Sequence, residues 1–226
     1  MGSTVRISFT NSKQVENLVK KYAEINILSK MTLKVRDNVR AKLPLIIKEM
    51  LEQTDVIKSL NGEFADDPQK DLPAHFGLTP AEGRLEARSI IDIFLNNLII
   101  QRDNKNYNSL NIYFNPTKIE SKLLSEIKGY TSINGFDIEW MDWLLNGHQI
   151  VGFNIVFGIM PGLDSRSGRA LMRKSPTGSW STSYYFYGKG DFLEKMLTNI
   201  NRKKVDALIR EEFKSVLKQY NTTRKI

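Results

Sequence analysis

The sequence predicts an α+β fold with a helical N-terminal half, a small antiparallel β-sheet with long loops, and a closing C-terminal helix. Three observations lead to this prediction. Apolar residues recur at helical spacing through most of residues 12–98, short alternating segments follow between 150 and 187, and helical spacing returns over 191–220. We expect one α+β domain over residues 1–226, with a mainly helical half (1–105) and a half made of the sheet and the closing helix (106–226).

The first elements are predicted from periodicity and capping residues. Residues 3–9 alternate apolar and polar side chains, which indicates a short strand. A helix is expected to begin at Asn11 or Ser12, and a further helical stretch covers 29–53. Pro44 should kink or split that stretch, because proline lacks the backbone N–H and its ring clashes with the preceding turn.

The middle of the chain alternates loops with clear start signals. Residues 61–78 are rich in turn formers and predict a long loop. Thr79-Pro80-Ala81-Glu82 combines a capping Thr, a first-turn Pro and a Glu in capping-box register, so a helix should begin there and run to Leu98. A polar break over 101–109 comes next.

The elements after this break are short. Residues 110–114 predict a strand that Pro116 ends, and 119–127 predict a helix closed by Gly129. In the second half, 140–145 predict one short amphipathic helix that ends at Asn146.

Three short strands and a long helix complete the prediction. The strands are expected as a meander. Their ranges are 150–157, 169–174 and 180–187. One helical stretch should cover 191–220, followed by a basic frayed tail over 221–226.

Composition limits the chemistry. The 226 residues are 41% hydrophobic and 26% charged, which is enough for a folded core and excludes wholesale disorder. The 33 Lys and Arg against 25 Asp and Glu give a net charge of +8, which favours a nucleic acid, an acidic protein face or a membrane surface as partner. The chain has no cysteine, so disulfides, thiolate zinc sites and a cysteine nucleophile are excluded. We expect no cofactor, no bound metal and no membrane-spanning segment.

The acidic residues favour structural over catalytic interpretations. Asp66, Asp67 and Asp71 lack the ligand pattern of a calcium loop, so a solvated acidic loop is favoured. The alternative of an acid–base or metal-dependent nuclease site at Asp137, Glu139 and Asp142 stays open. The flanking tryptophans instead indicate a polar rim around apolar residues.

Two segments of the second half carry candidate interaction residues. The loop 165–169 combines Ser, Gly and two arginines, which suits phosphate binding or a solvated hairpin loop. The aromatic run over 180–187 stands beside basic residues. Its composition suits a protein interface or core, or a platform on which single-stranded bases stack.

The second half also resembles a known family. The resemblance rests on a series of segments in a fixed order. These segments are Trp140-Met141-Asp142-Trp143-Leu144-Leu145-Asn146-Gly147, the strand at 151–157, Ser165-Arg166-Ser167-Gly168-Arg169-Ala170-Leu171-Met172, the Trp180 segment and the helix that begins at Phe192. This pattern resembles virion proteins of tailed bacteriophages, and the order of elements is similar to the head–tail joining family of neck, tail-completion and tail-terminator proteins. The first half is longer here than in compact members of that family.

The resemblance implies a non-enzymatic subunit of the virion head–tail junction, assembled in the host cytoplasm. It would form a homo-oligomeric ring, commonly a hexamer, between neighbouring portal or neck proteins and the tail tube. Positive charge would help DNA pass or attract an acidic neighbour. Under this hypothesis we expect Arg166, Arg169, Trp180 and Tyr184 to be interface residues. The alternative is a nucleic-acid-binding module that uses the basic aromatic hairpin.

Overall fold

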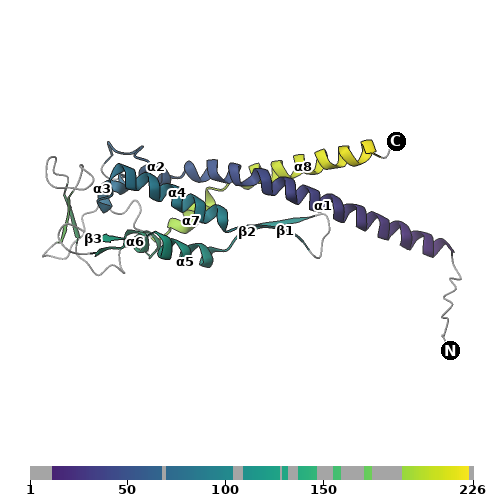
Figure 1. Cartoon of the computed structure of the whole chain (residues 1–226), viewed down its shortest axis with the longest axis horizontal. Helices are drawn as coiled ribbons and strands as arrows, with labels where there is room; N and C mark the ends of the chain where they lie inside the picture. Colours follow the sequence, from purple (N-terminus) through teal and green to yellow (C-terminus); the bar gives the residue numbers. More distant parts are fainter. Residues whose placement is uncertain are drawn as a thin grey trace, which may run out of the picture. The chain divides into compact units, whose positions relative to one another are not determined.

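The computed structural model describes residues 12–67, 70–103, 109–127, 129–131, 137–146, 155–158, 171–174 and 190–223 (Figure 1). The predicted α+β class is confirmed, because most described residues are helical and short strand pairs accompany a C-terminal helix. The described helices are α1 (Ser12–Glu52), α2 (Asp55–Leu60), α3 (Leu72–Phe76), α4 (Pro80–Asn96), α5 (Pro116–Glu126), α6 (Trp140–Asn146), α7 (Phe192–Thr198) and α8 (Arg202–Thr223).

The described strands form three separate pairs. They are β1 (Leu98–Arg102) with β2 (Leu110–Phe114), β3 (Tyr130–Thr131) with β4 (Asp137–Ile138), and β5 (Ile155–Gly158) with β6 (Leu171–Lys174). The β5–β6 pair is antiparallel, with Ile155 opposite Lys174 and Gly158 opposite Leu171, as two neighbouring strands of a meander should be. The strands expected at 3–9 and 180–187 lie outside the described residues.

The chain divides into two compact units. Unit 1 comprises Met1–Lys42, Ile100–Ile112 and Asp206–Ile226, and unit 2 comprises Leu43–Ile99 and Tyr113–Val205. Residues of α1, α8, β1 and β2 contribute to both units.

Helix α1 is one continuous element of 41 residues, so the expectation that Pro44 splits it is wrong. An interior proline costs about 3 kcal/mol through its missing N–H and ring clash. Burial of one large aliphatic side chain contributes about 1.5–3 kcal/mol, so a row of them outweighs that cost. The fully or almost fully buried side chains on both sides of the proline are Val35, Val39, Leu43, Ile47 and Leu51.

The predicted loop 61–78 contains a helix, because local polar groups close it. Ser59 donates from its hydroxyl to the Lys70 carbonyl at 2.5 Å and accepts the Leu72 N–H at 2.8 Å. The Asp71 carboxylate accepts the Ala74 N–H at 3.2 Å and caps α3. Asp71 is buried, so the interpretation of this residue as part of a solvated acidic loop is wrong.

The start of α4 is confirmed. Thr79 accepts the Glu82 N–H at 3.2 Å, and the Glu82 carboxylate accepts the Thr79 N–H at 2.8 Å, which completes the capping box. The helix ends at Asn96 and Leu98 already belongs to β1, so the expected helix to Leu98 is too long and the break over 101–109 begins too early. Asn97 donates from its side chain to the Ile93 carbonyl at 2.7 Å and so satisfies one of the last helical acceptors.

Helix α5 also differs from its expected ends. It begins at Pro116, where Asn115 accepts the Lys118 N–H at 3.1 Å. Ile127 in extended conformation follows its last residue, and among the described glycines only Gly62, Gly77 and Gly190 have positive φ. The prediction that Gly129 closes the helix is therefore wrong.

The last helical stretch is two helices and not one. Helix α7 ends at Thr198 and α8 begins at Arg202. Asn201 accepts the Lys203 N–H at 3.0 Å through its side chain and so starts a new helix. Helix α8 continues to Thr223, so the prediction of a frayed tail is wrong for residues 221–223.

Candidate functional site

The four predicted interface residues, Arg166, Arg169, Trp180 and Tyr184, lie outside the described residues. In the sequence, Arg166 and Arg169 lie between β5 and β6, which residues 159–170 join, and Trp180 and Tyr184 lie between β6 and α7. Helix α3 contacts β6 within unit 2. The assignment of these four residues to an interface stays a prediction.

Helix α6 carries the aromatic residues of the family-like pattern. Trp140 is buried, with its ring 5.7 Å from that of Phe76, and no residue that the structure describes accepts a hydrogen bond from its Nε1–H. Met141 and Leu144 are buried beside it in sequence. Trp140 therefore contributes to the core of unit 2.

The acidic residues Glu139 and Asp142 lie just before and within this helix. Glu139 is exposed, and the Asp142 carboxylate accepts a 2.7 Å hydrogen bond from the side chain of Asn146. Within the described part of the chain, no three His, Cys, Asp or Glu side chains are grouped so that they could hold a metal ion. The polar-rim interpretation of Glu139 fits its exposure.

A cavity of about 980 Å³ opens in unit 2 where α7 meets α8. Its lining is mixed, with apolar side chains such as Leu145 and Leu197 and the charged residues Glu120, Glu194 and Arg202.

The wall of this cavity is tied to the end of α1. Asn199 donates from its side-chain amide to the Met50 carbonyl at 2.8 Å, and the Asn201 N–H lies 3.1 Å from the Met50 sulfur. The turn between α7 and α8 is thereby held against α1 within unit 2. The sequence contains a signal for this break that apolar periodicity hides, because Asn199 and Asn201 stand two residues apart in it.

Among the described residues of unit 2, four large apolar side chains on four different elements are exposed. Leu45 of α1 is 65% exposed and Leu85 of α4 is 59% exposed. Tyr113 of β2 and Leu124 of α5 are also exposed.

Unit 1 contains a polar cluster that the sequence analysis missed, formed by Asn38, Lys42 and Glu212. The Glu212 carboxylate accepts from the Lys42 ammonium at 2.5 Å and from the Asn38 amide at 2.9 Å. Glu212 is only 5% exposed. The hydrogen bond from Lys42, aided by that from Asn38, holds the pKa of Glu212 below its ordinary value of 4.5 against the opposing effect of burial. A signal for this cluster is present, since Glu212 stands midway between Leu208 and Val216 on the apolar face of its helix.

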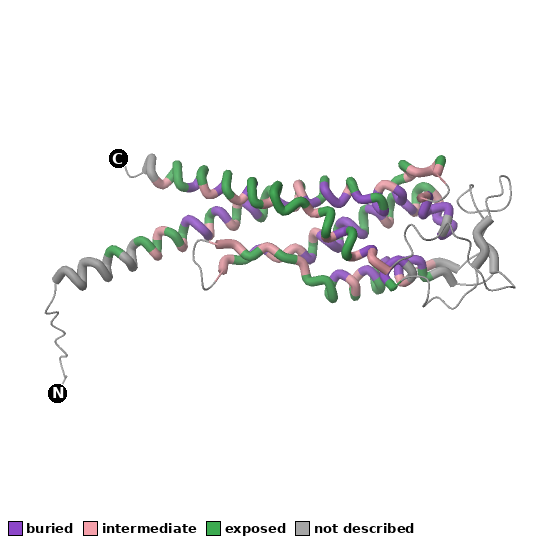
Figure 2. The backbone as a smooth tube through the Cα atoms, turned by 180° about the vertical axis from the view of Figure 1, so that it is seen from behind, coloured by how far each residue is buried: buried purple, intermediate pink, exposed green. Residues whose placement is uncertain are grey.

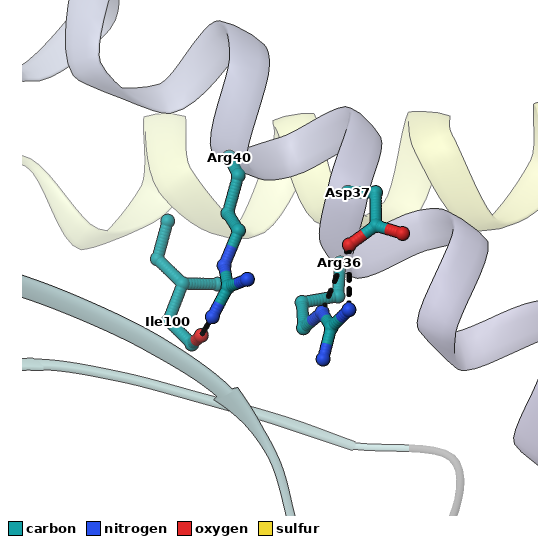
Figure 3. Close-up of polar contacts among 4 residues, drawn as sticks. All are labelled: Arg36, Asp37, Arg40 and Ile100. Carbon is teal, nitrogen blue, oxygen red and sulfur yellow. Dashed lines mark hydrogen bonds and ion pairs between the residues drawn. The ribbon is translucent and has the colours of Figure 1, made fainter.

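Other cations of unit 1 are used within the unit (Figure 3). Arg40 donates to the Ile100 carbonyl at 2.8 Å, and Arg36 donates to the Asp37 carboxylate at 2.7 Å. Arg102 donates to the hydroxyl of Ser29. The contacts of Arg40 and Arg102 join α1 to β1 within unit 1.

Comparison of the chain with protein-family models, with curated proteins and with solved structures finds no match. Among the described helices, none is both long enough and apolar enough to cross a membrane.

Proposed function

We propose that this protein is a non-catalytic structural subunit of the head–tail junction of a tailed bacteriophage. It assembles as a homo-oligomeric ring of the neck, tail-completion or tail-terminator type and binds neighbouring portal, neck or tail-tube proteins. The place in the virion rests on the resemblance of the pattern between residues 138 and 193. The assembly itself rests on one structural observation, the exposed large apolar side chains of unit 2.

A closed ring requires each subunit to present two different complementary surfaces. Unit 2 carries exposed apolar side chains on more than one element, which supports such an arrangement. Each leucine that a neighbouring subunit covers contributes about 1.5–3 kcal/mol, because its apolar surface leaves water. Leu45 and Leu85 are the most exposed of these side chains and are the strongest candidates for contact.

The described polar groups support a structural role in the same way. The buried carboxylate of Asp71 caps α3, and the buried carboxylate of Glu212 joins α1 to α8. Glu82 completes the capping box of α4. Each of these carboxylates already has a partner that stabilises a helix end or a helix pair.

Sedimentation velocity of the full chain over a range of concentrations tests the proposal. The wild-type protein should assemble, and a double variant with Leu45→Glu and Leu85→Glu should assemble at least tenfold more weakly, because each substitution would bury a charge in an apolar contact. A control with Gln53→Glu and Ala81→Glu adds the same charge at exposed positions of unit 2 and should assemble like the wild type.

Two outcomes would contradict the proposal. A wild-type protein that stays monomeric at its highest soluble concentration would exclude self-assembly. A double variant that assembles as well as the wild type, with an unchanged circular dichroism spectrum, would exclude the surface named above.

A further inference from the structure

The net positive charge of the chain comes from one of its two units. Unit 1 has 16 Lys and Arg against 7 Asp and Glu, a net charge of +9, whereas unit 2 has 17 against 18, a net charge of −1. Together they account for all 33 basic and 25 acidic residues of the chain. The excess of positive charge in the composition therefore belongs to unit 1. This unit contains the N-terminal part of α1, the C-terminal part of α8 and residues 100–112.

Two sets of cations can be distinguished among the described residues of unit 1. Arg36, Arg40 and Lys42 are engaged in the contacts described above. Four others are exposed, and none of them forms an ion pair with another described residue. We call them the outward cations; they are Lys30, Lys34, Arg210 and Lys214.

The outward cations are held in place by the helices that carry them. Lys30 and Lys34 are four residues apart on α1, as are Arg210 and Lys214 on α8, so each pair shares one helix face. On α8 the opposite face is the buried one, with Leu208, Glu212 and Val216, and Figure 2 shows exposed residues along the remainder of the helix. Successive members of a pair rise about 6 Å along the helix, so each flexible side chain can reach a separate phosphate of a duplex.

We propose that unit 1 binds double-stranded nucleic acid through its phosphate backbone, without sequence preference. The charge of the unit is complementary to a polyanion, and counterion release makes such contacts favourable at low salt. This inference goes beyond the proposed function and does not depend on ring assembly. A protein that stays monomeric and still binds duplex would contradict only the proposed function.

Other anionic partners fit the described surface less well. In the described part of α1 within this unit, Met31, Val35 and Val39 are buried, so these apolar side chains are not available to insert into lipid. The exposed large apolar side chains in the described part of unit 1 are Leu28 and Leu217, which provide no aromatic surface for stacking single-stranded bases. The residues that dominate protein interfaces are enriched in Trp, Tyr and Arg, and Arg210 alone among the outward cations is of these types.

Fluorescence anisotropy with a labelled DNA duplex of about two helical turns tests the inference. The full chain should bind two duplexes of unrelated sequence equally well, and its affinity should fall steeply between about 50 and 200 mM salt. Replacing the four outward cations by Gln should weaken binding at least tenfold and reduce the slope of log K against log salt by about 3–4.

A matched control removes four exposed cations from unit 2 by Arg84→Gln, Arg88→Gln, Lys118→Gln and Lys204→Gln. Because both variants lose the same net charge, only a surface on unit 1 predicts that the control keeps the wild-type salt slope. Circular dichroism spectra should match for all three proteins, because none of the eight side chains is buried.

Three results would overturn the inference. They are no duplex binding at the lowest salt concentration, an equal loss of affinity in both variants, and a preference for vesicles of phosphatidylserine and phosphatidylcholine in equal amounts over the duplex. The last result would make unit 1 a membrane-surface site.

Discussion

Lys42 and Glu212 are 170 residues apart in the chain, and their side chains join α1 to α8 at 2.5 Å within unit 1. Glu212 is buried while the Lys42 side chain is 58% exposed, so one partner of the pair remains in contact with solvent. The carboxylate therefore depends on Lys42 and Asn38 for the hydrogen bonds that water would otherwise supply.

Glu212→Gln should destabilise the protein by about 1 kcal/mol. A charge-assisted hydrogen bond contributes about 1.5–3 kcal/mol, and the exposure of Lys42 lowers that value through solvent screening. Urea denaturation measures the difference. Glu211→Gln is a matched control, because Glu211 is the adjacent residue and is exposed, and its effect should stay within about 0.5 kcal/mol. Equal effects of the two substitutions would contradict this account of the pair.

The contribution of Glu212 should depend on pH. Its pKa in the folded protein is lowered by Lys42 and Asn38, so its stabilising effect is present above the ordinary value of 4.5 and is lost as pH falls through the lower folded value. Glu86 has the opposite effect on the pH dependence of stability. Burial and the nearby Glu82 raise its pKa, so its contribution to folding becomes more favourable as pH falls. The free-energy difference between wild type and Glu212→Gln isolates the first effect. It should shrink from neutral pH to about pH 3, and a constant difference would contradict the assignment.

Thr79→Ala should cost about 1 kcal/mol of unfolding free energy, because the hydroxyl that accepts the Glu82 N–H at the start of α4 is lost. Thr79→Ser should retain most of the stability, since its hydroxyl can replace the acceptor. Thr117→Ala, at an exposed position in the first turn of α5, serves as control. A lower midpoint temperature of thermal unfolding for Thr117→Ala than for Thr79→Ala would refute the prediction.

Gly83→Ala should destabilise the protein, although helix propensity alone predicts a gain of about 1 kcal/mol. A Cβ on Gly83 would lie 2.6 Å from the Leu60 carbonyl oxygen and 3.2 Å from Pro73 Cγ, so α2 and α4 would have to separate. The expected cost is about 1–3 kcal/mol. Ser89→Ala, at an exposed position of the same helix, should be neutral or stabilising. Greater stability of Gly83→Ala in chemical denaturation would disprove this close packing.

Local signals predicted the elements that local interactions determine. The start of α4 followed from Thr79, Pro80 and Glu82 alone, and the bounds of β2 followed from alternation up to Phe114. These features depend on contacts within a few residues, so they can be read from the chain directly.

The errors arose where distant contacts decide the structure. Burial along α1 overrides Pro44, and the contact between Asn199 and Met50 separates α7 from α8 although apolar spacing continues across the break. The first residue of β1, Leu98, continues the apolar period of α4 and so favours a helix, and only the pairing of β1 with β2 makes it part of a strand. The role of Glu212 required knowledge that α1 and α8 are neighbours.

The sequence indicated the charge of the chain but not its distribution. The excess of +8 is visible in the composition, whereas its confinement to unit 1 follows only when residues 1–42, 100–112 and 206–226 are brought together. The four expected interface residues remain a sequence-based prediction.

Electron microscopy of the purified full chain tests the central claim, self-assembly into a closed ring, most directly. The account predicts particles whose class averages are rings of one copy number, because heterologous contacts that close produce a defined assembly. Fields that contain only single subunits at concentrations where the protein is soluble would contradict it.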